Sequence, residues 1–298
     1  MNDDAIVALF DRCSNTGRWG DDDELGTLNH ITDAKRLAAA GLVRHGRTVS
    51  IGKDLSTVAD RLNTVPMVHR LLYDQETPVS ALDSVDVAPH GFAITHLDAV
   101  AHIFWRGNAY NGRRAADVWR STGGLTTGSV HAQRDGIITR GVLLDVAGVR
   151  GVPYLPPGDT VTPDDLTAAE ERAGVRVETG DAIFVHVGVE RREAEHGIED
   201  PSLRAGLDAA CLPWLFDREV AVYSGDCVER VPYPSEAVPL PLHQIGLVAM
   251  GLVLLDCPRL ADLVATCTEL ETSAFLLTVA PLRIPGGTGS AVNPLCLF

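Results

Sequence analysis

Residues 90–102 read His90-Gly-Phe-Ala-Ile-Thr-His96-Leu-Asp98-Ala-Val-Ala-His102 and hold three of the ten histidines. Side chains two residues apart on a strand point to the same face, so His96 and Asp98 would direct an imidazole and a carboxylate toward one position. These two ligand types together suit zinc, manganese or iron(II) better than calcium or magnesium. His102, a turn further on, could face the same pocket as a ligand or as a base. Six residues of straight strand span roughly 20 Å, so His90 can join only if the chain bends at Gly91.

The same spacing also fits a plain hydrogen-bonded pair on a strand edge, because short motifs of this kind often arise by chance. A resemblance favours the metal site. Thr95-His96-Leu97-Asp98-Ala99 and His102 resemble the metal motif of the cyclase / kynurenine formamidase-type hydrolase family, which includes isatin hydrolases. The family pattern is roughly His-x-Gly-Thr-His-x-Asp-x-x-x-His. Here the first histidine falls at Phe92, and Ile94 replaces the glycine. Either His90 substitutes from a bent loop, or the site has one protein ligand fewer.

A second block, Pro239-Leu-Pro-Leu-His243-Gln244, precedes an apolar run that ends at Asp256. In the family, a histidine here and a glutamate twelve residues later complete the metal site. Counting back twelve from Asp256 reaches Gln244 rather than His243, so both stay candidates, and the shorter aspartate stands in the glutamate's place. One metal is therefore favoured over a full two-metal site. His102 would be the general base, as the equivalent family residue is thought to be.

The resemblance runs from about Trp19, in Trp-Gly-Asp-Asp-Asp-Glu-Leu-Gly-Thr-Leu-Asn29, to Asn293, in the closing Pro-Leu-Arg283-Ile-Pro-Gly-Gly-Thr-Gly289-Ser-Ala-Val-Asn293-Pro. It implies a swivelling β/β/α domain, of mixed α/β class, that forms a homodimer or homotetramer. It also implies hydrolysis of an amide, lactam or lactone in a small aryl or cyclic substrate, with Zn²⁺ or Mn²⁺ as cofactor. A metal-dependent cyclase of a polyketide-like substrate is an alternative, and so is a descendant that binds a small molecule without turnover. The sequence has no Gly-x-Ser-x-Gly, which disfavours a serine hydrolase.

The composition suits one domain over residues 1–298, with residues 1–45 as an N-terminal loop and helix extension. The 298 residues are 45% apolar, and the formal charge is −15. This charge argues against nucleic acid or an anionic membrane as partner, since both attract basic surfaces. The acidic start lacks the pattern of a signal peptide, and no apolar run is long enough for a membrane span, so a cytoplasmic protein is expected. Six scattered cysteines without Cys-x-x-Cys spacing predict reduced thiols, several of them buried.

Local signals predict the main elements. Thr32 and Gly41 bracket a helix over 33–40, and Thr162, Pro163 and an acidic third position predict a second helix over 163–173. A small-residue-rich apolar run predicts a helix over 245–255, and another helix is expected over 260–266. Strands are expected at 46–52, 67–73, 85–87, 140–146 and 220–226, as a pair within 175–188, and from residue 275, before a glycine-rich turn.

Several further residues are candidates for the substrate pocket. Phe92 is a candidate because it stands within the motif. The aromatic residues that follow the motif could line a pocket for a flat substrate or fill the core. His186 lies in an apolar run and suits a core or pocket-edge position better than a ligand position. Asp226 follows a buried strand, where it could serve the site or form a turn. The aromatic candidates beyond Phe92 are Phe104, Trp105 and Tyr110.

Overall fold

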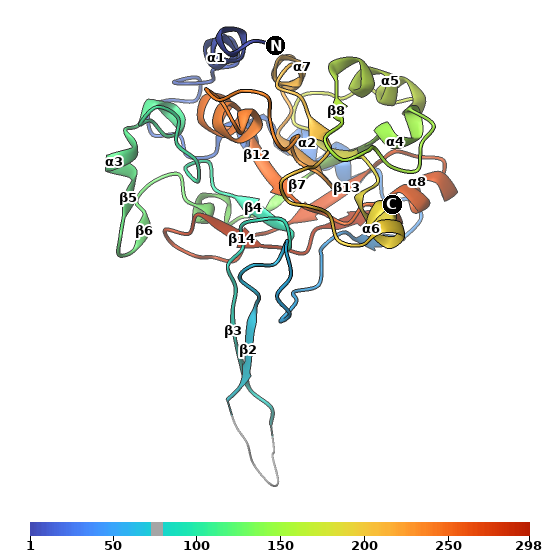
Figure 1. The fold of residues 1–298 in the computed structure, drawn as a ribbon, viewed down its shortest axis with the longest axis horizontal. Helices are drawn as coiled ribbons and strands as arrows, with labels where there is room; N and C mark the ends of the chain where they lie inside the picture. The colour runs from blue at the N-terminus through green and yellow to red at the C-terminus, as the bar shows by residue number, and fades with distance from the viewer. Residues whose placement is uncertain (73–79) are drawn as a thin grey trace.

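A curled, mixed nine-stranded sheet forms the centre of the computed structural model, which describes residues 1–72 and 80–298 (Figure 1). Four neighbouring strands in the middle run parallel, and the outer strands are antiparallel. The mixed α/β class is as predicted. In spatial order the strands are β1 (Thr48–Ser50), β15 (Leu295–Leu297), β13 (Ala274–Val279), β7 (Ile137–Asp145), β9 (Ala182–His186), β11 (Val222–Gly225), β12 (Val253–Asp256), β4 (His96–Asp98) and β14 (Gly289–Ala291).

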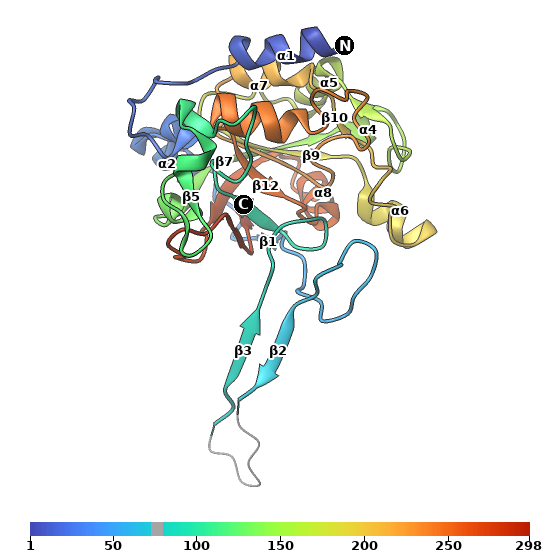
Figure 2. The same ribbon diagram turned by 60° about the vertical axis from the view of Figure 1, so that its left-hand side comes forward.

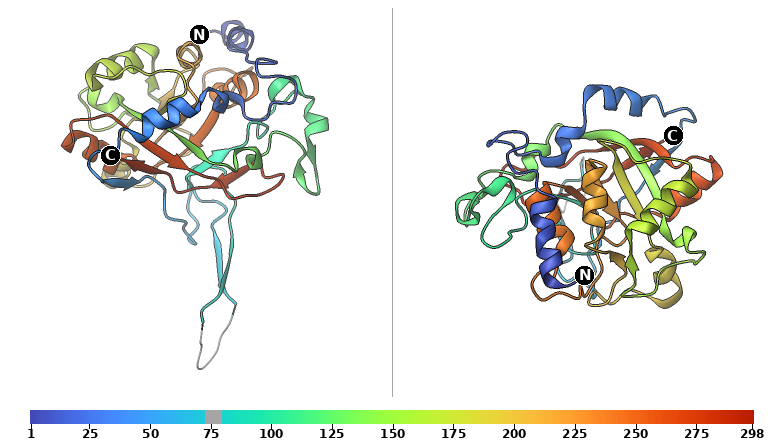
Figure 3. Two further views of the ribbon diagram at one scale, coloured as in Figure 1. Left: turned by 180° about the vertical axis from the view of Figure 1, so that it is seen from behind. Right: turned by 90° about the horizontal axis from the view of Figure 1, so that it is seen from above.

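The central strands are buried on both faces, which explains their unbroken apolar sequences. Alternate residues enter two different cores: Val142 and Leu144 pack on one side of the sheet, and Leu143 packs on the other. The first core is covered by α1, α5, α7 and η4, of which α1 and α7 lie above the sheet in Figure 2. On the other side, α2 crosses β7 and β13 (Figure 3, left) and α8 adds to the second core.

The helices are α1 (Asp3–Arg12), α2 (Asp33–Ala40), α3 (Ala115–Val118), α4 (Val146–Val149), α5 (Pro163–Ala173), α6 (Val189–His196), α7 (Cys211–Asp217), η4 (Leu242–Met250) and α8 (Ala261–Glu269). Short 3₁₀ turns are η1 (Gly26–His30), η2 (Tyr110–Gly112) and η3 (Val130–Gln133). Three two-stranded ribbons complete the described fold: β2 (Val68–Leu71) with β3 (Asp83–Asp86), β5 (Trp119–Arg120) with β6 (Gly124–Leu125), and β8 (Thr160–Val161) with β10 (Gly206–Leu207).

The capping signals predicted two helices correctly. Thr32 accepts a hydrogen bond from the Lys35 amide at the start of α2. Thr162 and Asp165 form a reciprocal capping box at the start of α5, which ends at left-handed Gly174. The helix predicted over 260–266 is α8, and the strands predicted near 46–52, 140–146, 220–226 and from 275 are also present.

The prediction of one helix over 245–255 is wrong. The run divides at Gly251, whose φ of +63° is left-handed and ends η4, so Val253–Asp256 continues as strand β12. The carbonyl carbon and Cα of Gly251 lie against Gly26, where a side chain would not fit. Tertiary contact at this point therefore separates a helix from a strand within one apolar sequence. Helix η4 is also wound as a π-helix, a form often found at functional sites.

The strand pair expected within 175–188 is also wrong, because only β9 forms there. The preceding backbone bonds to side chains instead of a neighbouring strand. The Val177 amide donates to Glu170, and the Glu178 amide donates to Asp181, whose buried carboxylate also binds Arg140. These bonds hold the approach to β9 as an ordered loop.

The ribbon of β2 and β3 projects from the body of the molecule (Figures 1 and 2). It confirms the strands predicted near 67–73 and 85–87, although Tyr73, at the end of the first, lies outside the described residues. All six cysteines are free, as predicted, and all of them are buried, where the prediction was that several would be. Within residues 1–72 and 80–298, no helix has the length and apolar character needed to cross a membrane.

Candidate metal centre

Strand β4 carries His96 and Asp98 on one face, as the spacing of two residues predicted. Both side chains are buried, and His96 Nε2 lies 3.6 Å from Asp98 Oδ1. β4 runs between β12 and β14, so His96 pairs in register with Asp256 at the end of β12. The sheet thereby brings a second carboxylate to the same place, and one ligand atom each from His96, Asp98 and Asp256 lies within 4.8 Å of the others.

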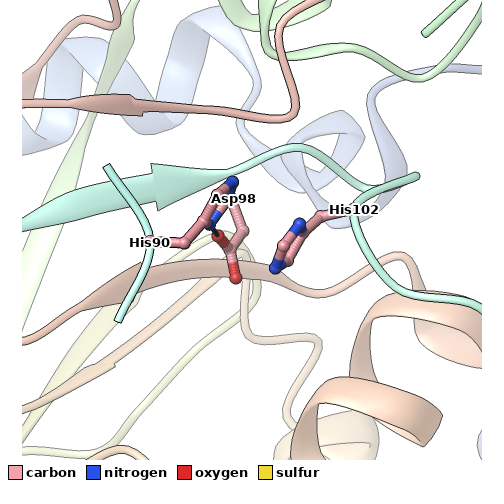
Figure 4. Close-up of side chains that lie close together, drawn as sticks. All are labelled: His90, Asp98 and His102. Atoms are coloured by element: carbon pink, nitrogen blue, oxygen red, sulfur yellow. Dashed lines mark ion pairs between the residues drawn. The ribbon is translucent and has the colours of Figure 1, made fainter. Parts of the chain in front are cut away.

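His90 reaches this group because the chain bends after it. Gly91 has a φ of +108°, a conformation that glycine adopts at little cost. The bend brings His90 Nδ1 to 3.1 Å from Asp98 Oδ1. The chain therefore bends at Gly91, as it must if His90 is to join the site. His102 comes from the turn after β4, and its ring stacks on that of His90 with centroids 3.8 Å apart. Figure 4 shows His90, Asp98 and His102 converging from before, on and after the strand.

Helix η4 contributes His243 rather than Gln244. His243 Nε2 lies 3.3 Å from Asp256 Oδ2 and 3.8 Å from Asp98 Oδ2. The Gln244 side chain turns back along the helix, where its Oε1 accepts a hydrogen bond from the Leu240 amide.

Glu229 is a site residue that the sequence analysis missed. This buried carboxylate contacts His243 Nδ1 through one oxygen and accepts a hydrogen bond from the Leu242 amide, at 2.9 Å, through the other. It therefore fixes both the ring and the start of η4. In the sequence, Glu229 appears only as an acidic residue three positions after Asp226. It stands fourteen positions before His243, and no local pattern over that distance indicates that the two side chains meet.

Several buried polar atoms at the centre have no hydrogen-bond partner among the described residues. They are His90 Nδ1, both Asp98 carboxylate oxygens and Asp256 Oδ1; His90 Nδ1 and Asp98 Oδ1 meet each other only as an ion-pair contact of 3.1 Å. Leaving such groups unpaired costs about 1–3 kcal/mol each, and more for a charged group. A cation bound beside Asp98 would supply the missing partners of its oxygens, and a set of imidazole nitrogens and carboxylate oxygens fits zinc, manganese or iron(II). The residues present therefore fit a divalent metal.

The charges at the site favour a cation in the same place. Burial by itself would raise the pKa of Asp98, but His90 and the other surrounding histidines lower it to about 2. Burial would lower the pKa of His243, but Glu229 and Asp256 raise it well above its usual value. The carboxylates thus hold a proton on His243 in the metal-free protein. Metal binding there would have to displace that proton.

His102 has the opposite electrostatic character. Burial lowers its pKa to about 4, because the attraction of Asp98 only partly offsets desolvation, and His90, His243 and His96 lower the pKa further. The ring is therefore neutral at pH 7 and is able to accept a proton. One ring nitrogen of His102 lies within 4.8 Å of one ring nitrogen of His90 and one carboxylate oxygen of Asp98.

The aromatic candidates divide between the site and the core. The guanidinium of buried Arg204 lies 4.3 Å from the centre of the Phe92 ring. Phe92 and His90 both line a cavity of about 310 Å³. Trp105 is buried and stacks with Phe10 of α1. Tyr110 is buried and donates a hydrogen bond to Asp23, and Phe104 is 37% exposed.

His186 and Asp226 both take up contacts of their own at the ends of strands. The ring of His186 bonds to Asp145, 2.7 Å away at the end of the adjacent strand β7. Asp226 accepts hydrogen bonds from the amides of residues 187, 188 and 189 and so holds the first turn of α6. Neither is among the groups that converge on Asp98.

A comparison with protein families gives a match to the Cyclase model over residues 28–229, more than half of the chain and including the β4 motif. The chain belongs to the cyclase family. Comparison with curated protein sequences gives no match. A solved structure described as a novel cyclase shares 26% identity, with a TM-score of 0.87 over 97% of this chain and 99% of that one.

More distant cyclase-fold structures share the architecture. Isatin hydrolase A from Ralstonia solanacearum has 22% identity and a TM-score of 0.60, over 89% of this chain and 97% of its own. A potential metal-dependent hydrolase with cyclase activity has 15% identity and a TM-score of 0.52, over 84% and 96%. In this cyclase family member, Phe92 stands where the motif of the resemblance has its first histidine, and the bend at Gly91 brings the imidazole of His90 to Asp98.

Proposed function

We propose that this cyclase family member is a metal-dependent hydrolase that cleaves an amide, lactam or lactone bond in a small aryl or cyclic substrate. One observation carries the proposal. Buried, unpaired ligand atoms of His90, Asp98 and Asp256 converge beside a histidine that stays neutral at pH 7. A site built only for stability would pair its buried polar atoms with each other.

His90, His96 and Asp98 would hold one divalent ion, Zn²⁺ or Mn²⁺, and His243 and Asp256 would complete the coordination around Asp98. When bound, such an ion lowers the pKa of a water molecule and polarises a carbonyl group. Glu229 would orient His243, in the way that a carboxylate commonly fixes a metal-binding imidazole.

His102 would act as general base and then as general acid. Its neutral ring can take a proton from the attacking water and return that proton to the leaving amine or alkoxide. The stack on His90 limits rotation of the ring and holds it next to Asp98. Removal of such a group typically costs about 10²–10⁴-fold in rate.

The cavity beside His90 supports a small, flat substrate. Its volume is about 310 Å³, and Phe92, Ile94 and Val65 give it apolar walls. This volume lies at the lower end of the usual range for small-molecule sites. The fold shared with isatin hydrolases makes a cyclic amide a sensible first substrate to test.

A cyclase reaction is the second candidate, because the structure described as a novel cyclase matches nearly the whole chain. In that reaction His102 would remove a proton from carbon instead of water. The two candidates differ in their products: hydrolysis adds water across a bond, whereas cyclisation closes a ring. Mass spectrometry of the product separates them.

The first experiment measures metal content and hydrolysis together. Elemental analysis of protein purified without chelator should find about one zinc or manganese per chain, and Asp98→Asn should lose it. His102→Asn should keep the metal but lose most hydrolysis of isatin or N-formylkynurenine. His45→Ala, which changes an exposed histidine, serves as the matched control.

Absence of metal from the wild type, even after zinc or manganese is added, would contradict the hydrolase proposal. Bound metal without turnover of any amide, lactam or lactone would leave a small-molecule-binding protein as the better description.

A further inference from the structure

The cavity beside His90 carries positive charge but no carboxylate. Its charged lining residue is Arg61, and Asn63, Thr64 and the candidate ligand His90 are the other polar side chains of the lining. None of the described residues that line this cavity is acidic. The whole chain has a formal charge of −15, so its composition alone does not explain this lining. Clefts lined by one sign of charge concentrate ligands of the opposite sign.

A second cavity, which shares Phe92 and Ala93 with the first, shows the contrast. It holds about 350 Å³ and mixes both signs of charge. Its charged lining residues are Lys53, Arg259, Asp60, Glu190 and Glu193. Two of them already form an ion pair, because Arg259 Nε lies 2.8 Å from Glu190 Oε1. The positive lining is therefore a property of the His90 cavity and not of the surrounding region.

A short loop fixes the backbone on which Arg61 stands. Asp60 Oδ1 accepts hydrogen bonds from the Leu62 and Asn63 amides, at 2.7 and 2.8 Å, as in a turn closed by an aspartate. The buried Asn63 side chain donates to the Val58 carbonyl at 2.8 Å. Asp60 thus binds backbone on both sides of Arg61 and lines the second cavity instead of this one. The Arg61 side chain itself is exposed and accessible to a ligand.

The exposed acidic residue Asp200 does not neutralise this wall. Its Oδ1 accepts hydrogen bonds from the Ser202 hydroxyl and amide, at 2.7 and 2.9 Å. These bonds lower the pKa of Asp200, and Arg61 adds to the effect through its charge. Asp200 is not among the residues that line the cavity.

A second guanidinium, that of Arg204, adds positive charge behind the Phe92 ring. It lies 4.3 Å from the ring centre, and its Nε donates to Glu199 at 3.0 Å. Both Nη atoms are buried without a hydrogen-bond partner among the described residues. Arg192 Nε also lies 3.7 Å from Glu199, so two guanidinium groups share one buried carboxylate. In a low-dielectric interior this surplus charge acts over a longer distance than it would in water.

We propose that the substrate is anionic: an aryl or cyclic amide, lactam or lactone that carries a carboxylate, which Arg61 binds while the scissile carbonyl faces the metal centre. The inference rests on the proposed function for the reaction and adds the class of substrate. A planar guanidinium offers a carboxylate two parallel N–H donors. Arg204 would not touch the substrate, but its charge would favour a carboxylate on the cavity side of Phe92.

The test compares formanilide with the ortho, meta and para formamidobenzoates, which keep its ring and formamide group and add a carboxylate. The wild type, purified without chelator, should hydrolyse at least one acid with a kcat/KM about tenfold or more above that of formanilide, because hydrogen bonds to charged groups are strong. Arg61→Ala should bring the ratio of the two kcat/KM values close to one. Arg61→Lys keeps the charge without the planar fork and should retain part of the ratio.

A binding measurement makes the test independent of turnover. His102→Asn, which removes the proposed base, allows calorimetric titration with intact formamides. The favoured acid should bind about tenfold more tightly than formanilide, and Arg61→Ala in the same background should remove the difference. Added salt should weaken binding of the acid and not of formanilide, because salt screens an exposed charge pair. Arg44→Ala, which changes an exposed arginine outside the cavity, is the matched control.

Equal binding of the acids and formanilide, or failure of all three acids to bind, would overturn the proposal. A preference for the acid that survives Arg61→Ala would also overturn it and would indicate that the carboxylate contacts the metal centre. If no formamide is hydrolysed but an acid binds by way of Arg61, the hydrolase function fails and the inference of an anionic ligand stands. If formanilide is hydrolysed as well as the acids are, the hydrolase function stands and the inference fails.

Discussion

Asp98 belongs to both groups of candidate ligands, one with His90 and His102 and the other with His96 and Asp256. It is fully buried, and neither carboxylate oxygen has a hydrogen-bond partner among the described residues. A buried carboxylate is stable in this form only if positive charge surrounds it. The protonated ring of His243 supplies part of that charge in the metal-free protein. Burial would raise the pKa of Asp98, but His90 and the other surrounding histidines lower it to about 2.

At the same scale, Glu229 should control metal affinity without touching the metal. Glu229→Gln keeps the size of the side chain but removes the charge that orients His243. We expect metal affinity to fall by about 10–100-fold, measured by competition with a chromogenic chelator. Glu236→Gln, at an exposed position in the same segment, is the control. If both variants bind metal like the wild type, Glu229 has only a structural role.

At the scale of elements, the ends of parallel strands bring polar groups together. Asp145 closes β7 and His186 closes β9, and the register places them opposite each other. Burial by itself would lower the pKa of His186, but Asp145 and nearby carboxylates raise it above its usual value. Burial would likewise raise the pKa of Asp145, but His186 lowers it.

This pair should make stability depend on pH. Because the folded protein holds the His186 proton more tightly than the unfolded chain, the stabilisation is complete below about pH 6.5 and declines as pH rises through the raised pKa. The free energy of unfolding should therefore fall by on the order of 1 kcal/mol from pH 6 toward pH 9. Urea titrations should show a flatter dependence for His186→Gln. An identical dependence in wild type and variant would count against the pair.

At the scale of the whole molecule, the candidate centre joins segments far apart in the chain. It draws on His90 before the bend at Gly91, strands β4 and β12, and helix η4. A metal that binds only the folded state stabilises it by about 2.7 kcal/mol at one hundred times its dissociation constant.

Saturating zinc or manganese should therefore raise the melting temperature of chelator-treated protein by roughly 5 °C or more. Differential scanning calorimetry checks this, with Asp98→Asn as the variant expected to show no shift. An equal shift in Asp98→Asn would place the stabilising metal elsewhere.

The sequence by itself determined the parts that depend on short-range rules. Spacing of two residues placed His96 and Asp98 on one face, and the capping residues Thr32 and Thr162 set the starts of two helices. The motif around β4 indicated the family. These features depend on side-chain periodicity and local hydrogen bonds, which a few neighbouring residues define completely.

Only the tertiary structure decided the features that depend on contacts between distant residues. The apolar run before Asp256 could not reveal its division into η4 and β12, because Gly26 and Tyr110, far away in sequence, shape the turn at Gly251. The winding of η4 decided that His243, and not Gln244, faces Asp256. The loop that leads into η4 decided that Glu229 contacts His243. Packing fixes such positions, and no local pattern encodes them.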